Sequence, residues 1–146
     1  MQEIEFQKIR LENCGCHSEV DMEFHKGILT GIVGKNGKGK STIFKSLMVG
    51  LFGDTGEARE STNVGDLVNR KHPKDLLIDI WWKVDDQQYE VRKYQNHKKH
   101  RNKTILLKGE EDITAKSVTD THKKIEDILV NKNIFRNTVW RIPPLR

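Results

Sequence analysis

The chain of 146 residues has the length of one ordinary domain. Its 35% hydrophobic and 32% charged residues indicate a modest core under a large solvated surface. No apolar run approaches the roughly 20 residues that a membrane helix needs, and the acidic start of the sequence is unlike a signal peptide. We therefore expect a cytoplasmic protein with no membrane partner. The formal net charge of +5 is compatible with a polyanionic partner but does not identify one.

The first third of the sequence predicts three strands. Residues 4–11 alternate as a strand whose apolar side chains change face near Gln7, which indicates a bulge. Residues 20–24 alternate cleanly, as a strand with one solvated face does. Residues 28–33 are almost continuously apolar, as expected of a strand covered on both faces.

Two cysteines, Cys14 and Cys16, lie between the first two predicted strands. They are too few and too close together to form a disulfide framework. Together with Gly15 and His17 they leave two interpretations open, a metal site or reduced thiols at the end of a strand. The sequence has no second Cys/His cluster to complete a tetrahedral site, which favours the thiols.

A helix is predicted immediately after residue 41, because its apolar residues recur with helical spacing. Gly53 is a natural end for this helix. The polar residues 54–75 are expected to form a long surface excursion with a short helix near residues 64–68. The apolar stripe of the long helix consists of Ile43, Phe44, Leu47, Met48, Leu51 and Phe52.

The second half of the sequence predicts a hairpin of residues 76–84 and 89–94, followed by a short strand at residues 104–107. Alternation places Trp82 on the buried face with Ile78, Ile80 and Val84, so we interpret it as a core residue. Trp81 points the opposite way, where base stacking is the alternative to a structural role.

Ser117 is expected to cap a helix that extends to about Val130, with Asp120 placed for a capping box. One more strand is predicted at residues 134–140. The predicted buried stripe of the helix consists of Val118, His122, Ile125, Ile128 and Leu129.

Residues 34–41 match the P-loop motif G-x-x-x-x-G-K-[ST] without a mismatch, between an apolar strand and an amphipathic helix. The alternative is a surface loop that is rich in glycine and lysine. Glycines in the loop let its backbone amides approach phosphate oxygens, and the helix N-terminus presents further N–H groups. Lys40 is expected to reach the β- and γ-phosphates, Ser41 to hold Mg²⁺ and Thr42 to meet the α-phosphate. The predicted nucleotide-binding residues are Gly34, Lys35, Asn36, Gly37, Lys38, Gly39, Lys40, Ser41 and Thr42.

With these elements placed, the sequence resembles the SbcC/Rad-fifty family of SMC-like, ABC-type ATPases, to which phage recombination endonuclease subunits belong. The resemblance is strong over residues 4–53, is weaker through the hairpin and returns at residues 135–140. It implies an α/β P-loop NTPase fold, namely the N-terminal lobe of an ABC-type ATPase head with a mixed sheet and an antiparallel hairpin subdomain. Residues 1–140 would form this Walker A half-domain, and residues 141–146 a divergent or truncated tail.

The resemblance also implies ATP and Mg²⁺ as ligands, Lys40 as the catalytic residue of the loop, and hydrolysis only in a full-length parent. The implied partners are DNA, an SbcD-like nuclease subunit and a second head in a homodimer, in a bacterial or phage-infected cell. Gly15 departs from the arginine that the family often has, and Ile142 and Pro143 stand where its Q-loop glutamine is expected. A RecF-type or other P-loop ATPase, or a hydrolysis-dead module that binds nucleotide or DNA, remains the alternative.

A run of positive charge follows the second strand of the predicted hairpin. Residues 91–103 contain six Lys and Arg residues and no acidic residue. Contact with DNA phosphates and a solvated hairpin tip are both open interpretations. The predicted DNA contacts are Lys98, Lys99, Arg101 and Lys103.

Overall fold

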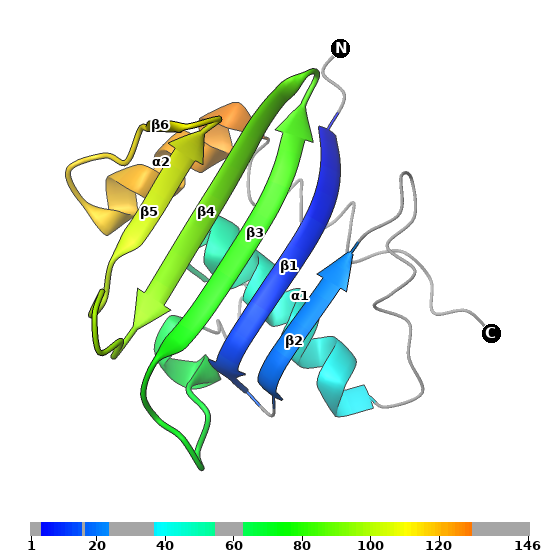
Figure 1. Cartoon of the computed structure of the whole chain (residues 1–146), viewed down its shortest axis with the longest axis vertical. Coiled ribbons are helices and arrows are strands. Elements are labelled where there is room, and N and C mark those ends of the chain that lie inside the picture. The colour runs from blue at the N-terminus through cyan, green and yellow to red at the C-terminus, as the bar shows by residue number, and fades with distance from the viewer. Residues whose placement is uncertain (1–3, 16, 24–36, 55–62, 130–146) are drawn as a thin grey trace.

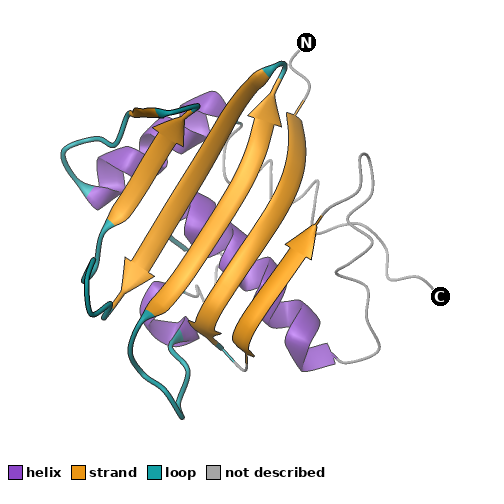
Figure 2. Ribbon diagram, in the orientation of Figure 1, coloured by secondary structure: helices purple, strands orange, loops and turns teal. Residues whose placement is uncertain are grey.

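The computed structural model describes residues 4–15, 17–23, 37–54 and 63–129, with only the backbone described at residues 17 and 37–42. The described strands form one six-stranded sheet in the order β2-β1-β3-β4-β5-β6, and each neighbouring pair is antiparallel. Both α-helices cover one face of this sheet (Figures 1 and 2). The elements are β1 (Ile4–Cys14), β2 (His17–Glu23), α1 (Gly37–Phe52), the 3-10 helix η2 (Val64–Leu67), β3 (Leu76–Val84), β4 (Gln87–Gln95), β5 (Thr104–Lys108), β6 (Glu111–Asp112) and α2 (Val118–Ile128).

The core lies between the helices and the sheet, and it follows the alternation of the sequence. In β3, Ile78, Ile80 and Trp82 are fully buried on the face that the helices cover. The register of β1 against β3 shifts between Phe6 and Lys8, which confirms the predicted bulge. The predicted apolar stripe of α1 is buried apart from Phe44, which is half-buried against the core. The strands predicted at residues 28–33 and 134–140 lie outside the described residues.

The start of α2 confirms one prediction and contradicts another. The Ser117 Oγ accepts a hydrogen bond from the Asp120 backbone N–H at 3.0 Å, which confirms the N-cap. Val118 was expected in the buried stripe, but it is 42% exposed. It lies in the first turn of the helix, at the rim of two pockets, where the sheet does not cover it. Thr121, which is fully buried, contributes to the packed face instead.

Two carboxyl groups lie close together on the sheet face opposite the helices. Asp79 in β3 and Glu90 in β4 are both buried, and the Oδ1 atom of Asp79 has no hydrogen-bond partner. Arg92 donates to Glu90 at 2.7 Å, but its Nε atom lies 3.9 Å from Asp79. Burial, followed by the neighbouring Glu90, raises the pKa of Asp79 to about 9 in spite of Arg92 and Lys8. We infer that Asp79 stays protonated at neutral pH and shares its proton with Glu90.

Asp79→Asn should therefore change how stability depends on pH. A folded pKa near 9 means that the proton-linked stability is complete below the unfolded value of 3.8 and is lost as the pH rises through 9. An amide keeps the uncharged form at every pH, so the variant should gain up to about 5 kcal/mol on wild type between pH 5 and pH 9, at roughly 1.4 kcal/mol per pH unit. Urea denaturation at both pH values measures this difference, and a constant difference would contradict the shared proton. In the control Asp112→Asn the difference from wild type should stay constant over this range, because hydrogen bonds from Thr114 lower the pKa of Asp112 and its carboxyl is ionised in both the folded and the unfolded chain.

Candidate nucleotide-binding site

The P-loop motif runs into the long helix, but the helix begins inside the motif rather than after residue 41, where the sequence predicts it. Helix α1 begins at Gly37, inside the motif, so the backbone of residues 37–42 forms its first turns. The first N–H groups of an α-helix have no partner within the helix and carry the positive end of its dipole. Gly34, Lys35 and Asn36 lie outside the described residues, and the side chains of Lys38, Lys40, Ser41 and Thr42 are not described. Their predicted roles stay predictions.

Close packing fixes helix α1 on the sheet. A Cβ atom added at Gly50 would lie 2.6 Å from Ile80 Cδ1 and 2.8 Å from Ile78 Cγ2, so the helix needs glycine there to approach β3. Farther toward its start, Ser46 Oγ lies 3.2 Å from the buried sulfur of Cys14 in β1. The helix that carries the motif is therefore anchored to the neighbouring strands β1 and β3.

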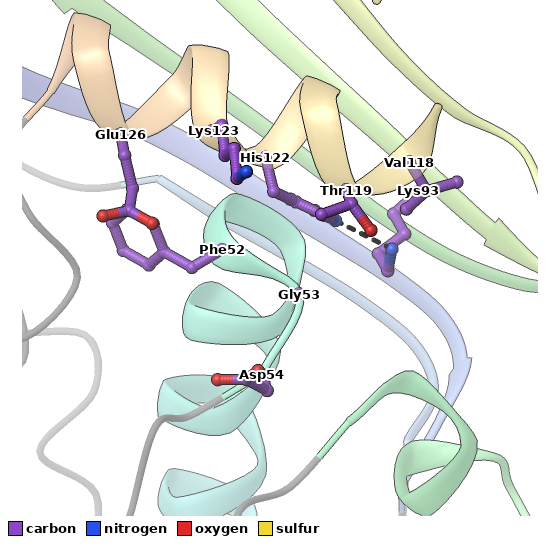
Figure 3. Close-up of a pocket in the computed structure, with 9 residues that line it drawn as sticks. All are labelled: Phe52, Gly53, Asp54, Lys93, Val118, Thr119, His122, Lys123 and Glu126. Carbon is purple, nitrogen blue, oxygen red and sulfur yellow. Dashed lines mark hydrogen bonds between the residues drawn. The ribbon is translucent and has the colours of Figure 1, made fainter. Parts of the chain in front are cut away.

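A buried polar network holds the other end of α1 (Figure 3). The ring of His122 in α2 lies with Nδ1 2.8 Å from the Leu51 carbonyl oxygen and Nε2 3.0 Å from Lys93 Nζ. A carbonyl only accepts, so Nδ1 carries the proton and Nε2 accepts from the lysine, which makes His122 neutral. Lys93 Nζ also donates to Thr104 Oγ1 at 3.1 Å. One imidazole thus connects the end of the P-loop helix to β4, and through Lys93 to β5.

A pocket of about 360 Å³ opens beside this network, between Gly53 and the exposed side of α2. Lys93 is buried at its edge, and burial lowers the pKa of this lysine to about 8. Asp54 and Glu126 bring carboxylates to the same pocket as Lys93 and Lys123. The pocket therefore has no excess of either charge.

The structure separates the basic run of residues 91–103 into two groups. Lys93 is buried in the network just described, so it is not available to a polyanion. Sequence reasoning missed this, although Lys93 follows Tyr89 and Val91 in the alternation of a strand with one buried face. The predicted DNA contacts lie beyond the end of β4, and all four are exposed: Lys98, Lys99, Arg101 and Lys103.

The described residues contain neither a membrane-spanning helix nor a metal-binding cluster. No described helix is both long and apolar enough to cross a membrane. No three His, Cys, Asp or Glu side chains in the same part of the chain come together in a way that could hold a metal ion. Cys16, one of the two cysteines of the possible metal site, lies outside the described residues.

Comparison with known proteins identifies the family. The family described as an AAA domain matches residues 8–140, which is most of the chain. The chain belongs to this family. Among curated relatives of this AAA domain, exonuclease subunit 2 of Escherichia phage RB69 is 30% identical over 97 residues, 65% of this chain and 17% of the relative. The DNA double-strand break repair Rad50 ATPase of Methanocaldococcus jannaschii is 29% identical over 136 residues, 92% of this chain and 12% of the relative.

A solved structure gives the fold of the AAA domain. The matching chain in that solved structure comes from work on ATP-driven dimerization and DNA-stimulated activation of SMC ATPases. It matches with a TM-score of 0.57 and 22% identity over 88% of the present chain and 80% of its own length. The likeness confirms the predicted α/β fold. The AAA domain spans only 12% to 17% of the two curated relatives' length, so what those whole proteins do reaches this chain only as a proposal.

Proposed function

We propose that this AAA domain is the ATP-binding N-terminal part of an ATPase that works with a nuclease in the repair of DNA double-strand breaks. The observation that carries the proposal is the start of helix α1 at Gly37, inside a complete P-loop motif. An anchored helix whose free N–H groups follow a glycine-rich loop is the arrangement that binds phosphate. The names of the relatives, exonuclease subunit 2 and Rad50 ATPase, supply the biological setting.

Within the proposed site, backbone amides of the loop and the first helical turn bind the phosphates. Lys40 neutralises charge at the β- and γ-phosphates, and Ser41 and Thr42 add hydroxyl groups at the metal and the α-phosphate. Mg²⁺, held with the help of the Ser41 hydroxyl, would supply positive charge that stabilises the negative charge of the phosphates. The chain spans only a small part of its relatives, so the remaining proposals concern a longer whole protein. We propose that this whole protein hydrolyses ATP, forms a homodimer of heads, binds an SbcD-like nuclease and works in the cytoplasm.

Lys40→Ala should remove most of the affinity for nucleotide. A hydrogen bond to a charged group contributes about 1.5 to 3 kcal/mol, which corresponds to roughly 10- to 100-fold in the dissociation constant. Calorimetric titration of the 146-residue chain with a non-hydrolysable ATP analogue and Mg²⁺ measures it. Ser41→Ala should mainly weaken the dependence on Mg²⁺.

Lys45→Ala is the matched control, because it removes a lysine from the same helix beyond the motif. Its affinity should equal that of wild type. If Lys40→Ala also binds the analogue as wild type does, the P-loop is not the nucleotide site and the proposal is wrong.

A further inference from the structure

A second basic segment lies against the predicted DNA contacts. The tip segment, residues 96–103, connects β4 to β5, and the loop segment, residues 69–75, leads into β3 at the same end of the sheet (Figure 1). The Lys98 N–H donates to Asp75 Oδ1 at 2.6 Å, and the Asp75 N–H donates to the Asn96 carbonyl at 3.0 Å. These bonds join two segments that are separated in the sequence by the whole β3–β4 hairpin. We call the two segments together the basic end.

The basic end carries the net positive charge of the entire chain. It contains seven of the 26 Lys and Arg residues but only one of the 21 Asp and Glu residues, namely Asp75. The remainder of the chain therefore has 19 basic and 20 acidic residues. The loop segment contributes Arg70, Lys71 and Lys74, all of which are exposed, as are the four cations of the tip segment. In the described part of the chain, none of the seven forms a salt bridge.

Neutral side chains and Asp75 fix the backbone of the basic end and leave its cations free. Asn69 Oδ1 accepts from the Lys71 and His72 N–H groups at 2.8 and 3.0 Å. In the tip, His97 Nδ1 accepts from the Lys99 and His100 N–H groups, both at 3.1 Å. A backbone that is already ordered lowers the entropic cost of binding, because only the long side chains remain to be immobilised.

We propose that residues 69–75 and 96–103 form one surface that binds the phosphate backbone of duplex DNA without reading its sequence. The choice of DNA among polyanions rests on the proposed function, whereas the surface itself rests on the contacts and charges above. Binding of single strands uses aromatic side chains on which bases stack. Tyr94, in β4 beside the tip, is buried and stacked on His100 with centroids 4.3 Å apart, and residues 69–75 and 96–103 contain no Trp, Tyr or Phe on which a base could stack.

His100 supplies a second, independent readout of the same surface. Desolvation lowers the pKa of His100, and the positive charges of Lys99, Lys103 and Arg92 lower it further. A phosphate backbone bound at the basic end would offset those charges. The pKa of His100, followed by NMR titration, should therefore rise when duplex DNA is added.

The experiment compares a loop variant and a tip variant with a control that removes as many charges as the loop variant, all in the full 146-residue chain. The loop variant is Arg70→Gln, Lys71→Gln and Lys74→Gln, and the tip variant replaces its four cations with Gln. The control replaces three exposed lysines away from the basic end, Lys108, Lys123 and Lys124, with Gln. Fluorescence anisotropy with a labelled duplex of about 20 base pairs, repeated from 50 to 200 mM salt, gives the slope of log affinity against log salt.

Each lost phosphate contact should flatten this slope by about 0.9, so we expect a decrease of roughly 2 to 3 in the loop variant and 3 to 4 in the tip variant. Sequence preference and the control slope should not change. An unchanged slope in the loop variant, or an equal decrease in the control, would overturn the proposal. Titration of every protein with the ATP analogue separates the two proposals: nucleotide binding without a salt-dependent DNA affinity overturns only this one, and the reverse overturns only the P-loop site.

Discussion

Trp82→Ala is expected to lower the free energy of unfolding by about 3 to 5 kcal/mol, the range for truncation of a large aromatic core residue. Trp82 has an exposed fraction of 0% and stacks on Tyr89 with ring centroids 5.7 Å apart. Its removal would leave a cavity between the helices and the middle of the sheet, which the surrounding strands can close only in part. Urea denaturation followed by circular dichroism measures the loss, because it does not depend on tryptophan emission.

The neighbouring residue offers a matched control. Trp81 lies on the opposite face of β3, half-buried, with Lys8 Nζ 5.1 Å from its ring centroid. An exposed cation–π pair contributes about 0.5 to 1 kcal/mol, so Trp81→Ala should cost far less than Trp82→Ala. Equal losses in the two variants would mean that the register of β3 is not the one described.

His122→Ala is expected to cost about 2 to 4 kcal/mol at pH 7, because it removes buried contacts and leaves two buried polar groups without their partner. The Leu51 carbonyl loses a donor and the Lys93 ammonium group loses an acceptor. His122→Gln should recover part of the loss, since an amide can donate to Leu51 and accept from Lys93. Lys123→Ala, an exposed neighbour on α2, is the control and should be nearly neutral.

The loss in His122→Ala should also depend on pH. The folded pKa of Lys93 is lowered to about 8 from 10.5, so the folded state releases this proton before the unfolded chain does. The stability that this release contributes therefore appears as the pH rises through 8 and is complete above 10.5. A neutral amine needs the imidazole acceptor less than an ammonium group does, and the penalty should be smaller at pH 9 than at pH 6. Equal penalties at both pH values would show that Lys93 is not the group that His122 supports.

Much of the fold could be predicted because its signals are local. Alternation located β3 and the buried face of Trp82, the change of phase near Gln7 located the bulge, and Ser117 located the start of α2. Lys93 shows where this reasoning failed. Its positive charge suggested an exposed run, although its position in the alternation of β4 indicated the buried face. A lysine can be buried on that face because Thr104 and His122 accept its hydrogen bonds, and both residues are distant from it in the sequence.

The candidate sites divide in the same way. The P-loop is a continuous motif, so its residues could be found from the sequence without any knowledge of the fold. The basic end could not, because it exists only when Asp75 and Asn96, both with positive φ, bring residues 69–75 against residues 96–103. The four cations of the tip were predicted, whereas Arg70, Lys71 and Lys74 of the loop were read only as part of a polar excursion.

The antiparallel order of the sheet also has a consequence for folding kinetics. The pairs β1–β2, β3–β4 and β4–β5 join strands that are close in the chain, but the β1–β3 pair matches Leu11 with Ile78. Closing so long a loop costs entropy before any contact is gained, and such pairings slow folding. The hairpins formed by strands close in the chain are therefore expected to form early, and the pairing of β1 with β3 is expected to come late. The folding rate should be set at the β1–β3 seam, where the helix with the P-loop packs against the sheet (Figure 1).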